Sequence, residues 1–169
     1  MTPQMKLVSL LSAAVLIVLL SCSERNQRVD TRFNEQASLA ATLPFNPLQG
    51  RVITSWIDKQ NSTMSTLFGN DLAVQHARSS SNQDYPDGSV LAVVTWTQQE
   101  DPRWFGGNIP EQTKSVELIE VDGGSKRSSP WFSYQEYEGS QLKNTSSWEG
   151  ATPVNRVAFL LSQRAAVMP

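Results

Sequence analysis

Cysteine and histidine are almost absent from this sequence. Its 169 residues include one cysteine, Cys22, and one histidine, His76. A zinc or copper site is therefore excluded unless carboxylates complete it, and no disulfide can form within one chain. An excess of positive charge is also lacking, because 14 lysine and arginine residues stand against 16 aspartate and glutamate residues. Nothing in this balance indicates binding to nucleic acid.

One long apolar run is present, at the N-terminus. Lys6 is the only charged residue among the first 21, and the apolar run 7–20 that follows it leads through Ser21 to Cys22. A basic start and an apolar segment of this length are typical of a secretory signal peptide, and the run is short for a spanning helix. The ending LLSC resembles a bacterial lipobox, in which the cysteine is lipidated and becomes the first residue. We therefore expect residues 1–21 to be a lipoprotein signal peptide and Cys22 to carry the lipid.

Two other interpretations of the N-terminus stay open: an uncleaved membrane anchor, and a plain secretory signal with an unrelated cysteine. In the lipoprotein interpretation the protein is bacterial, extracytoplasmic and anchored to a membrane by its lipid. Ser23 rather than aspartate follows the cysteine, which favours the outer membrane, on its periplasmic side, in a host with two membranes. Residues 22–43 are polar and are expected to form a tether, with a short helix around 34–42 as an option.

The folded domain is expected to span residues 44–169. Cleavage would leave 148 of the 169 residues, with 13 basic and 16 acidic side chains, enough for one domain around one core. Asn70 favours the start of a helix that runs to about Arg78, and 155–163 fits either a last strand or a short helix. Five further segments predict strands: 51–58, 63–68, 89–96, 114–121 and 131–139. These elements predict an α+β domain with a mostly antiparallel β-sheet.

The residue patterns also predict which side chains are buried. In segment 51–58, strict alternation would put Val52, Thr54 and Trp56 on one face. The helix is expected to face inward through Leu72, Ala73 and Ala77. The segment 89–96 is apolar on both sides and is expected to be buried through Val90, Leu91, Ala92, Val93 and Val94. The five tryptophans either build the core or line a ligand pocket.

Candidate catalytic residues are few. His76 lies at the edge of the apolar face of its helix, and the sequence has no G-x-S-x-G motif whose serine it could activate. A structural histidine is therefore favoured over a base or a metal ligand. Glu136 and Glu138 point the same way on a strand, whereas Glu117 and Glu120 point opposite ways. Such acids can transfer protons in a cleft, but a solvated sheet face is the favoured interpretation. We assign no catalytic, cofactor-binding or metal-binding residue.

Several stretches occur in an order that resembles one family. They are WID, TMSTLFGNDLAVQHAR, YPDGSVLAVVTW, DPRW and YQEYEG, starting at residues 56, 63, 85, 101 and 134. Together they resemble the cytochrome P-460 family, which includes the cytochromes c′-beta, over roughly residues 50–165. The resemblance implies an antiparallel β-sheet domain with flanking helices, commonly a homodimer. It also implies a c-type haem on a C-x-x-C-H motif, which serves hydroxylamine oxidation or the binding of small gases such as nitric oxide.

The haem motif of that family is lost in this sequence. The family's motif comes just before a T-x-V segment, here at 152–154, so its two cysteines fall on Ser147 and Gly150 and its axial histidine on Ala151. The strand lysine that cross-links haem in the hydroxylamine-oxidising members corresponds to Val93. A c-type haem needs thiols and an axial donor, and these degenerate positions supply neither.

Three hypotheses follow. The first is a lipid-anchored P-460-like domain without a cofactor, in a binding or structural role rather than as an enzyme. The second is an oxidoreductase or nitric oxide binding protein that holds haem non-covalently through His76 or a methionine such as Met64. The third is a chance resemblance in an unrelated small lipoprotein. The expected partners are the membrane, through the lipid, and a second copy in a homodimer; nucleic acid is not expected.

Overall fold

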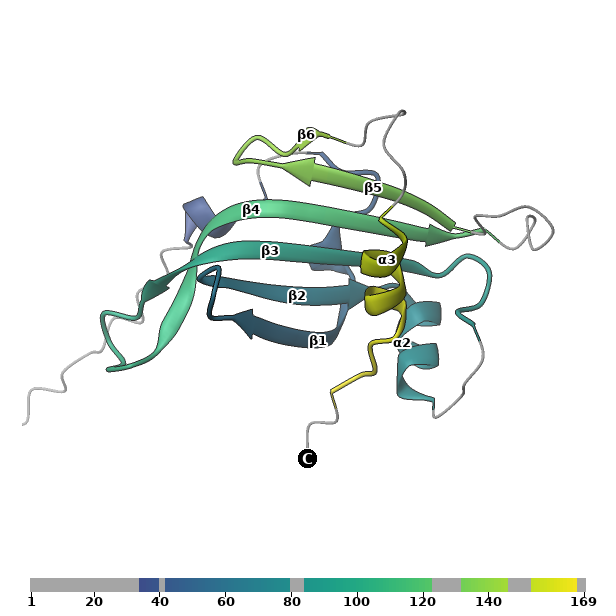
Figure 1. Ribbon diagram of the computed structural model, residues 1–169, viewed down its shortest axis with the longest axis horizontal. Coiled ribbons are helices and arrows are strands. Elements are labelled where there is room, and N and C mark those ends of the chain that lie inside the picture. The colour runs from purple at the N-terminus through teal and green to yellow at the C-terminus, as the bar shows by residue number, and fades with distance from the viewer. Residues whose placement is uncertain (1–33, 40–41, 80–83, 123–131, 146–152, 167–169) are drawn as a thin grey trace, which may run out of the picture. The chain divides into compact units, whose positions relative to one another are not determined.

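A six-stranded antiparallel sheet forms the centre of the fold, and each strand pairs with the next one along the chain (Figure 1). The computed structural model describes residues 34–39, 42–79, 84–122, 132–145 and 153–166, all within the unit Phe33–Pro169. The strands are β1 (Arg51–Asp58), β2 (Thr63–Gly69), β3 (Val90–Glu100), β4 (Asn108–Val121), β5 (Phe132–Glu138) and β6 (Lys143–Asn144). The predicted α+β class with a mostly antiparallel sheet is confirmed.

Two α-helices lie on one face of this sheet (Figure 1). Helix α2 (Asp71–Arg78) connects β2 to β3, and α3 (Val154–Leu161) follows β6, so the segment that fitted either a strand or a helix is a helix. Asn70 caps α2, because its Oδ1 accepts a hydrogen bond from the backbone N of Ala73 at 3.0 Å. Two short 3₁₀ turns precede the sheet, η1 (Glu35–Ala37) and η2 (Pro47–Gln49). Within the described ranges, no helix has the length and apolar character needed to cross a bilayer.

Both faces of the sheet are covered by apolar side chains. On the side of α2 and α3, which we call the helix face, the buried cluster comprises Ile53, Leu67, Ala73, Val74, Ala77, Tyr85, Leu91, Val93, Ile119, Val121, Val157 and Leu160. On the other side, the back face, it comprises Phe68, Ala92, Val94, Trp96, Val116, Leu118, Tyr137 and Leu142. The back face has no α-helix in the described chain; apolar side chains from the N-terminal segment 37–45 pack on it instead.

The folded unit begins earlier than residue 44. Trp96 donates its indole N–H to the carbonyl of Ala37 at 2.8 Å, and the side-chain amide of Asn34 donates to the carbonyl of Pro110 at 2.7 Å. These contacts hold residues 34–39 on the sheet, where the sequence predicted a polar tether. The optional helix around 34–42 is only the single turn η1. Residues 1–33, which include the expected signal peptide and Cys22, lie outside the described residues.

Some side-chain predictions are wrong. A register shift between Val52 and Thr54 interrupts the alternation of β1, so Ile53 is buried in the helix-face cluster and Trp56 packs against the same cluster. In α2, Ala73 and Ala77 are buried as predicted, but Leu72 is 46% exposed, and Val74, for which no burial was predicted, is buried. Of the apolar residues in β3, Leu91 to Val94 are buried as predicted, but Val90 is only half-buried.

Candidate functional site

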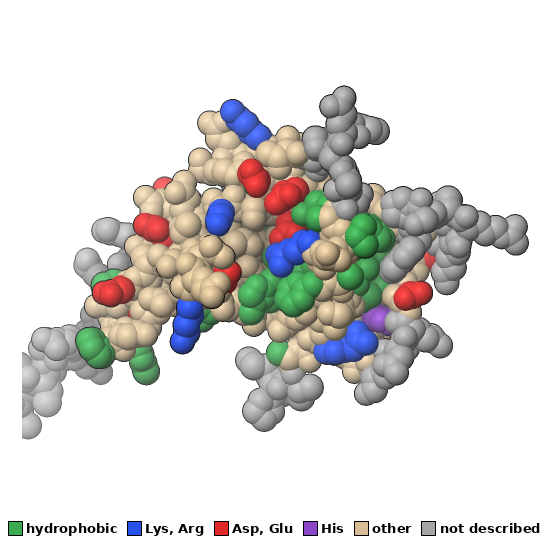
Figure 2. All heavy atoms as spheres, viewed as in Figure 1, with side chains coloured by type: hydrophobic (Ala, Val, Ile, Leu, Met, Phe, Trp, Pro, Cys, Tyr) green, Lys and Arg blue, Asp and Glu red, His purple; other side chains and the backbone are tan. Residues whose placement is uncertain are grey.

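The helix face holds a polar cleft where α2 and α3 leave the sheet uncovered. The cleft has a volume of about 600 Å³ and is lined from β1 to β5 and by α3. Its hydroxyl-bearing floor residues are Thr63, Ser65, Thr95, Thr97 and Ser115, and its acidic residues are Asp58, Glu117, Glu136 and Glu138. The lining also includes two basic side chains, Lys114 and Arg156, and the ring of Trp56. Figure 2 shows this face, with acidic and basic side chains gathered near its middle beside apolar atoms.

The floor of the cleft arises from a change of residue type along three neighbouring strands. Ser65 lies opposite Thr95, and Thr95 lies opposite Ser115, so hydroxyl groups form a row across β2, β3 and β4. The Ser65 and Thr95 hydroxyls are 2.9 Å apart and hydrogen-bonded. Because side chains alternate along a strand, the same face continues two residues further as apolar Leu67 and Val93 beneath the helices. Each strand is therefore apolar under the helices and polar in the cleft.

An ion pair joins α3 to β4 at the wall of the cleft. Arg156 donates from Nη2 to Oε1 of Glu117 at 2.6 Å and from Nε to Oε2 at 3.0 Å. The side chain of Glu117 is only 6% exposed and that of Arg156 is 35% exposed. A bidentate, charge-assisted pair of this kind is strong and geometrically specific. The hydrogen bond to Glu117 raises the pKa of Arg156 further above its ordinary value.

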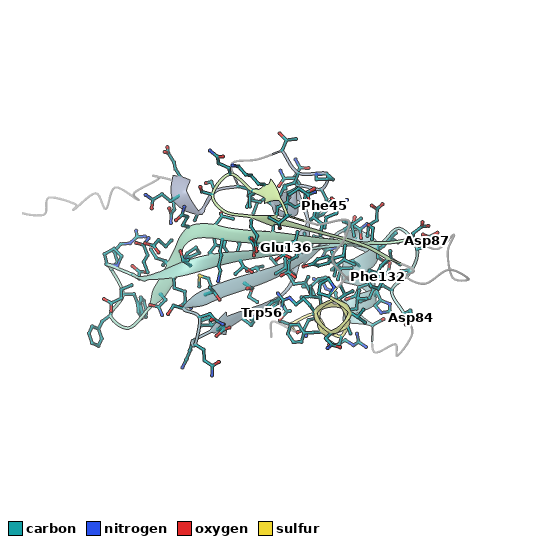
Figure 3. All side chains as sticks on the ribbon, turned by 45° about the horizontal axis from the view of Figure 1, so that its top comes forward. Phe45, Trp56, Asp84, Asp87, Phe132 and Glu136 are labelled. Atoms are coloured by element: carbon teal, nitrogen blue, oxygen red, sulfur yellow. The ribbon has the colours of Figure 1, made fainter. Side chains whose placement is uncertain are left out.

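Aromatic rings flank the guanidinium of Arg156. Its central carbon lies 5.9 Å from the ring centroid of Trp56 and 5.6 Å from that of Phe159. The two rings meet edge to face, with centroids 5.9 Å apart. A cation over aromatic rings is favourable when it is partly shielded from water. The guanidinium of Arg156 thus lies between the carboxylate of Glu117 and two aromatic rings. Figure 3 labels Trp56 on β1 and Glu136 on β5, the two outer strands that line the cleft.

Tyr134 links the two carboxylates of the wall. Its hydroxyl lies 3.0 Å from Oε2 of Glu117 and 3.3 Å from Oε2 of Glu136, and its single proton is shared between them. Burial and the two negative charges raise the pKa of Tyr134 far above its ordinary value, so it stays neutral. Burial, followed by repulsion from Glu117 and Glu138, also raises the pKa of Glu136. The wall of the cleft thus holds two carboxylates, Glu117 and Glu136, on either side of one tyrosine hydroxyl.

Haem does not fit the described part of this cleft. None of the described lining residues carries an imidazole, a thioether or a thiol, and its carboxylates would repel the negative propionates of haem. His76 lies on α2, half-buried, with its ring centroid 4.2 Å from that of Tyr85. Met64 packs on the back face. The structure therefore places neither of the two suggested iron ligands in the cleft, and the described residues hold no cluster of three or more potential metal ligands.

Of the lipid-attachment and degenerate haem positions that the sequence indicates, the structure describes Val93 alone. Val93 is 1% exposed and sits in the helix-face cluster, paired with Leu67 on one side and Glu117 on the other. Cys22 and the degenerate motif positions Ser147, Gly150 and Ala151 lie outside the described residues.

The sequence interpretation missed the wall of the cleft. Glu117 is buried and paired, whereas the sequence favours a solvated face for it; Glu120 is exposed on the opposite side of β4 as expected. The floor could have been found, because serine and threonine recur at every second position of 63–65 and 95–97. Nothing in the sequence showed that Arg156 would reach Glu117, since that contact depends on where α3 packs.

The comparison with known proteins agrees with this architecture. No curated protein matches the chain. The family model described as Cytochrome P460 matches residues 49–153, a stretch that contains all six strands and α2. Because the match covers more than half of the 169 residues and the fold is the one that the resemblance implied, this chain belongs to the Cytochrome P460 family.

Proposed function

We propose that this domain is a lipid-anchored, extracytoplasmic binding protein that holds a small polar, positively charged ligand in the cleft of the helix face and carries no covalent haem. The observation that supports this most directly is the chemistry of the lining. Four carboxylates and two basic side chains give an acidic excess over a floor of hydroxyl groups. A cleft of about 600 Å³ has the size of a small-molecule site.

The charges within the cleft favour a cation. Arg156 is paired with Glu117. The other charged side chains that line the cleft are three acids, Asp58, Glu136 and Glu138, and one base, Lys114. Burial raises the pKa of Glu136 most, and repulsion from Glu117 and Glu138 adds to the shift. A ligand with an ammonium group would offset that repulsion. Its remaining donors and acceptors would meet Thr97 and Ser115, which lie along the floor of the cleft.

Putrescine, a linear diamine, is a suitable probe for this proposal, and 1,4-butanediol is its uncharged counterpart. We expect isothermal titration to show saturable binding of putrescine, and little binding of the diol. The double variant Glu136→Gln/Glu138→Gln should weaken putrescine binding by at least 10-fold. Glu120→Gln, which removes an exposed carboxylate from the other face of β4, should leave it unchanged. Equal binding of the two compounds, or none of either, would remove the case for a cation site.

The second part of the proposal is the lipid anchor at Cys22, most simply in an outer membrane on its periplasmic side. The LLSC ending after the apolar run 7–20 supports it. We expect the protein to partition into the detergent phase of Triton X-114, because two acyl chains anchor firmly where one is marginal. Cys22→Ser should remain unprocessed or become soluble. Normal cleavage and unchanged membrane association in Cys22→Ser would exclude lipidation.

A further inference from the structure

The turn between β3 and β4 exposes two neighbouring aromatic side chains. Trp104 is 75% exposed and Phe105 is fully exposed, and neither belongs to a core cluster. Figure 2 shows apolar side chains projecting at the left, where β3 and β4 turn in Figure 1. Arg103, whose side chain is 78% exposed, precedes them. We call residues 103–105 the aromatic tip.

The aromatic tip is held in place by its own backbone. Asp101 N donates to the carbonyl of Gly107 at 2.9 Å, and Gly107 N donates to the carbonyl of Trp104 at 2.9 Å. Gly106 has a φ of +76°, a conformation that favours glycine. The side chain of Asp101 accepts from Arg103 N at 2.8 Å. The rings are therefore not needed to form the turn, and their exposure indicates a partner surface.

The chain enters the folded unit close to the same turn. Asn34 is hydrogen-bonded to Pro110, which lies three residues beyond Gly107, a rise of roughly 10 Å along a strand. Figure 1 shows η1 toward the same end of the sheet as this turn, at the left of the view. Twelve residue steps separate Asn34 from Cys22, and they span at most about 40 Å when fully extended. A lipid on Cys22 would thus hold the end of the sheet that carries the aromatic tip within reach of the bilayer.

We propose that the aromatic tip inserts into the lipid interface of the membrane to which Cys22 anchors the chain; this rests on the lipidation proposed above. Tryptophan prefers the boundary between headgroups and acyl chains, where its ring is buried and its N–H stays near water. Arg103 beside it can reach lipid phosphates with its charged end. The insertion would give the domain a second contact and a fixed orientation, with the polar cleft on a side face of the sheet.

The test uses the mature lipoprotein in vesicles of phosphatidylethanolamine and phosphatidylglycerol at 3:1, with or without brominated acyl chains that quench tryptophan. Trp104→Tyr removes the tryptophan fluorescence of the aromatic tip and keeps an aromatic ring there. The fluorescence of the natural protein minus that of Trp104→Tyr is therefore the signal of Trp104. We expect brominated lipid to quench at least half of that difference signal. Vesicles should slow protease cleavage at the aromatic tip of the natural protein. In Trp104→Ser/Phe105→Ser this slowing should be at least 5-fold smaller. The matched control Leu72→Ser, at an exposed apolar residue on α2, should change neither result.

Each outcome separates this inference from the proposed function. Mass spectrometry of the N-terminal peptide and flotation with vesicles test lipidation alone. An acylated protein that floats but shows no quenching of the Trp104 signal overturns the insertion and leaves the anchor intact. A Cys22 without lipid overturns both. A homodimer that dissociates in Trp104→Ser/Phe105→Ser, again without quenching, assigns the aromatic tip to a second copy and also overturns the insertion.

Discussion

Arg156 and Glu117 form a two-point ion pair between α3 and β4, with contacts of 2.6 and 3.0 Å. The pair closes one wall of the cleft and connects the C-terminal helix to the centre of the sheet. Tyr134 donates to the same carboxylate from β5. Glu117 thus accepts hydrogen bonds from α3 and from β5, which explains how its carboxylate can remain buried on a sheet face.

Removal of the guanidinium should destabilise the domain because it leaves Glu117 buried without its counter-charge. We expect Arg156→Met to lower the free energy of unfolding by about 2–4 kcal/mol, less than for a fully buried pair because Arg156 is partly exposed. Arg156→Lys should cost less, since it keeps the charge but loses the two-point geometry. Urea unfolding at pH 7 measures both.

A double variant provides the control for this pair. Glu117→Leu/Arg156→Met removes both charges, so we expect it to be more stable than Arg156→Met alone by at least about 1 kcal/mol. If the double variant is as unstable as the sum of the two single variants, the two side chains do not interact, and the ion pair has no role in holding α3.

Glu136 should make stability depend on pH in an unusual direction for a carboxylate. Its pKa in the folded protein is raised above the ordinary 4.5 by burial and by the charges of Glu117 and Glu138. Near pH 4 and below, both states are largely protonated and the group has little effect. As the pH rises through 4.5 and then through the folded pKa, the unfolded chain loses its proton first, so stability falls.

Glu136→Gln should therefore stabilise the protein at pH 7, by less than about 1 kcal/mol because the group is half-exposed to water, and the gain should vanish near pH 4. Urea midpoints of the two proteins between pH 4 and 7 measure the difference. Glu120→Gln, on the opposite face, should change stability by under about 0.5 kcal/mol. A gain in Glu136→Gln that grows toward acid pH would contradict the raised pKa.

Periodicity and capping residues predicted most of the elements. The apolar pattern of 89–96 placed β3, and Asn70 marked the start of α2, because both signals are local. The β3–β4 hairpin is longer than expected, since β3 continues to Glu100 and β4 begins at Asn108. Its polar ends carry no apolar alternation and are held by backbone pairing instead.

The parts that the sequence did not predict depend on long-range contacts. The shift in β1 that puts Ile53 and Trp56 on one face is a change in pairing with β2, which leaves no residue signature. Segment 34–39 looks like a tether because it is polar, yet Ala37 binds Trp96 through a backbone carbonyl, which any residue provides. The wall of the cleft likewise needed the position of α3, so Arg156 could not be singled out in advance.

Val93 offers a test of how the family's cross-link position is used in this chain. Val93→Lys should lower the free energy of unfolding by about 2 kcal/mol less than Val94→Lys does. A lysine at 93 lies beside the carboxylate of Glu117, whereas position 94 is enclosed by the apolar back-face cluster. Val93→Asp should cost several kcal/mol, because it adds a second negative charge next to Glu117. Thermal unfolding of the three variants ranks them, and equal costs for Val93→Lys and Val94→Lys would show that Glu117 does not help the new charge.

The final prediction concerns covalent haem. Expressed with a working cytochrome c maturation system, the mature domain should be colourless and give no pyridine haemochrome after acid–acetone extraction. Maturation joins haem vinyl groups to cysteine thiols, and Ser147 and Gly150 supply none. Covalent haem on the natural sequence would overturn the proposed function outright.

The triple variant Ser147→Cys, Gly150→Cys and Ala151→His restores the motif as Cys-Trp-Glu-Cys-His and tests whether the site has only lost its ligands. If the restored motif directs haem into the described cleft, simple recovery is opposed by Arg156, Glu117 and Glu136, because these charged groups line the cleft and a macrocycle needs apolar walls. We expect haem attachment to lower the unfolding temperature of the triple variant relative to its haem-free form, since an apolar macrocycle would take water and hydrogen bonds away from these charged groups. Adding Arg156→Leu and Glu117→Leu should reduce that loss. Stable covalent haem in the triple variant alone would show that the charged wall does not exclude the cofactor.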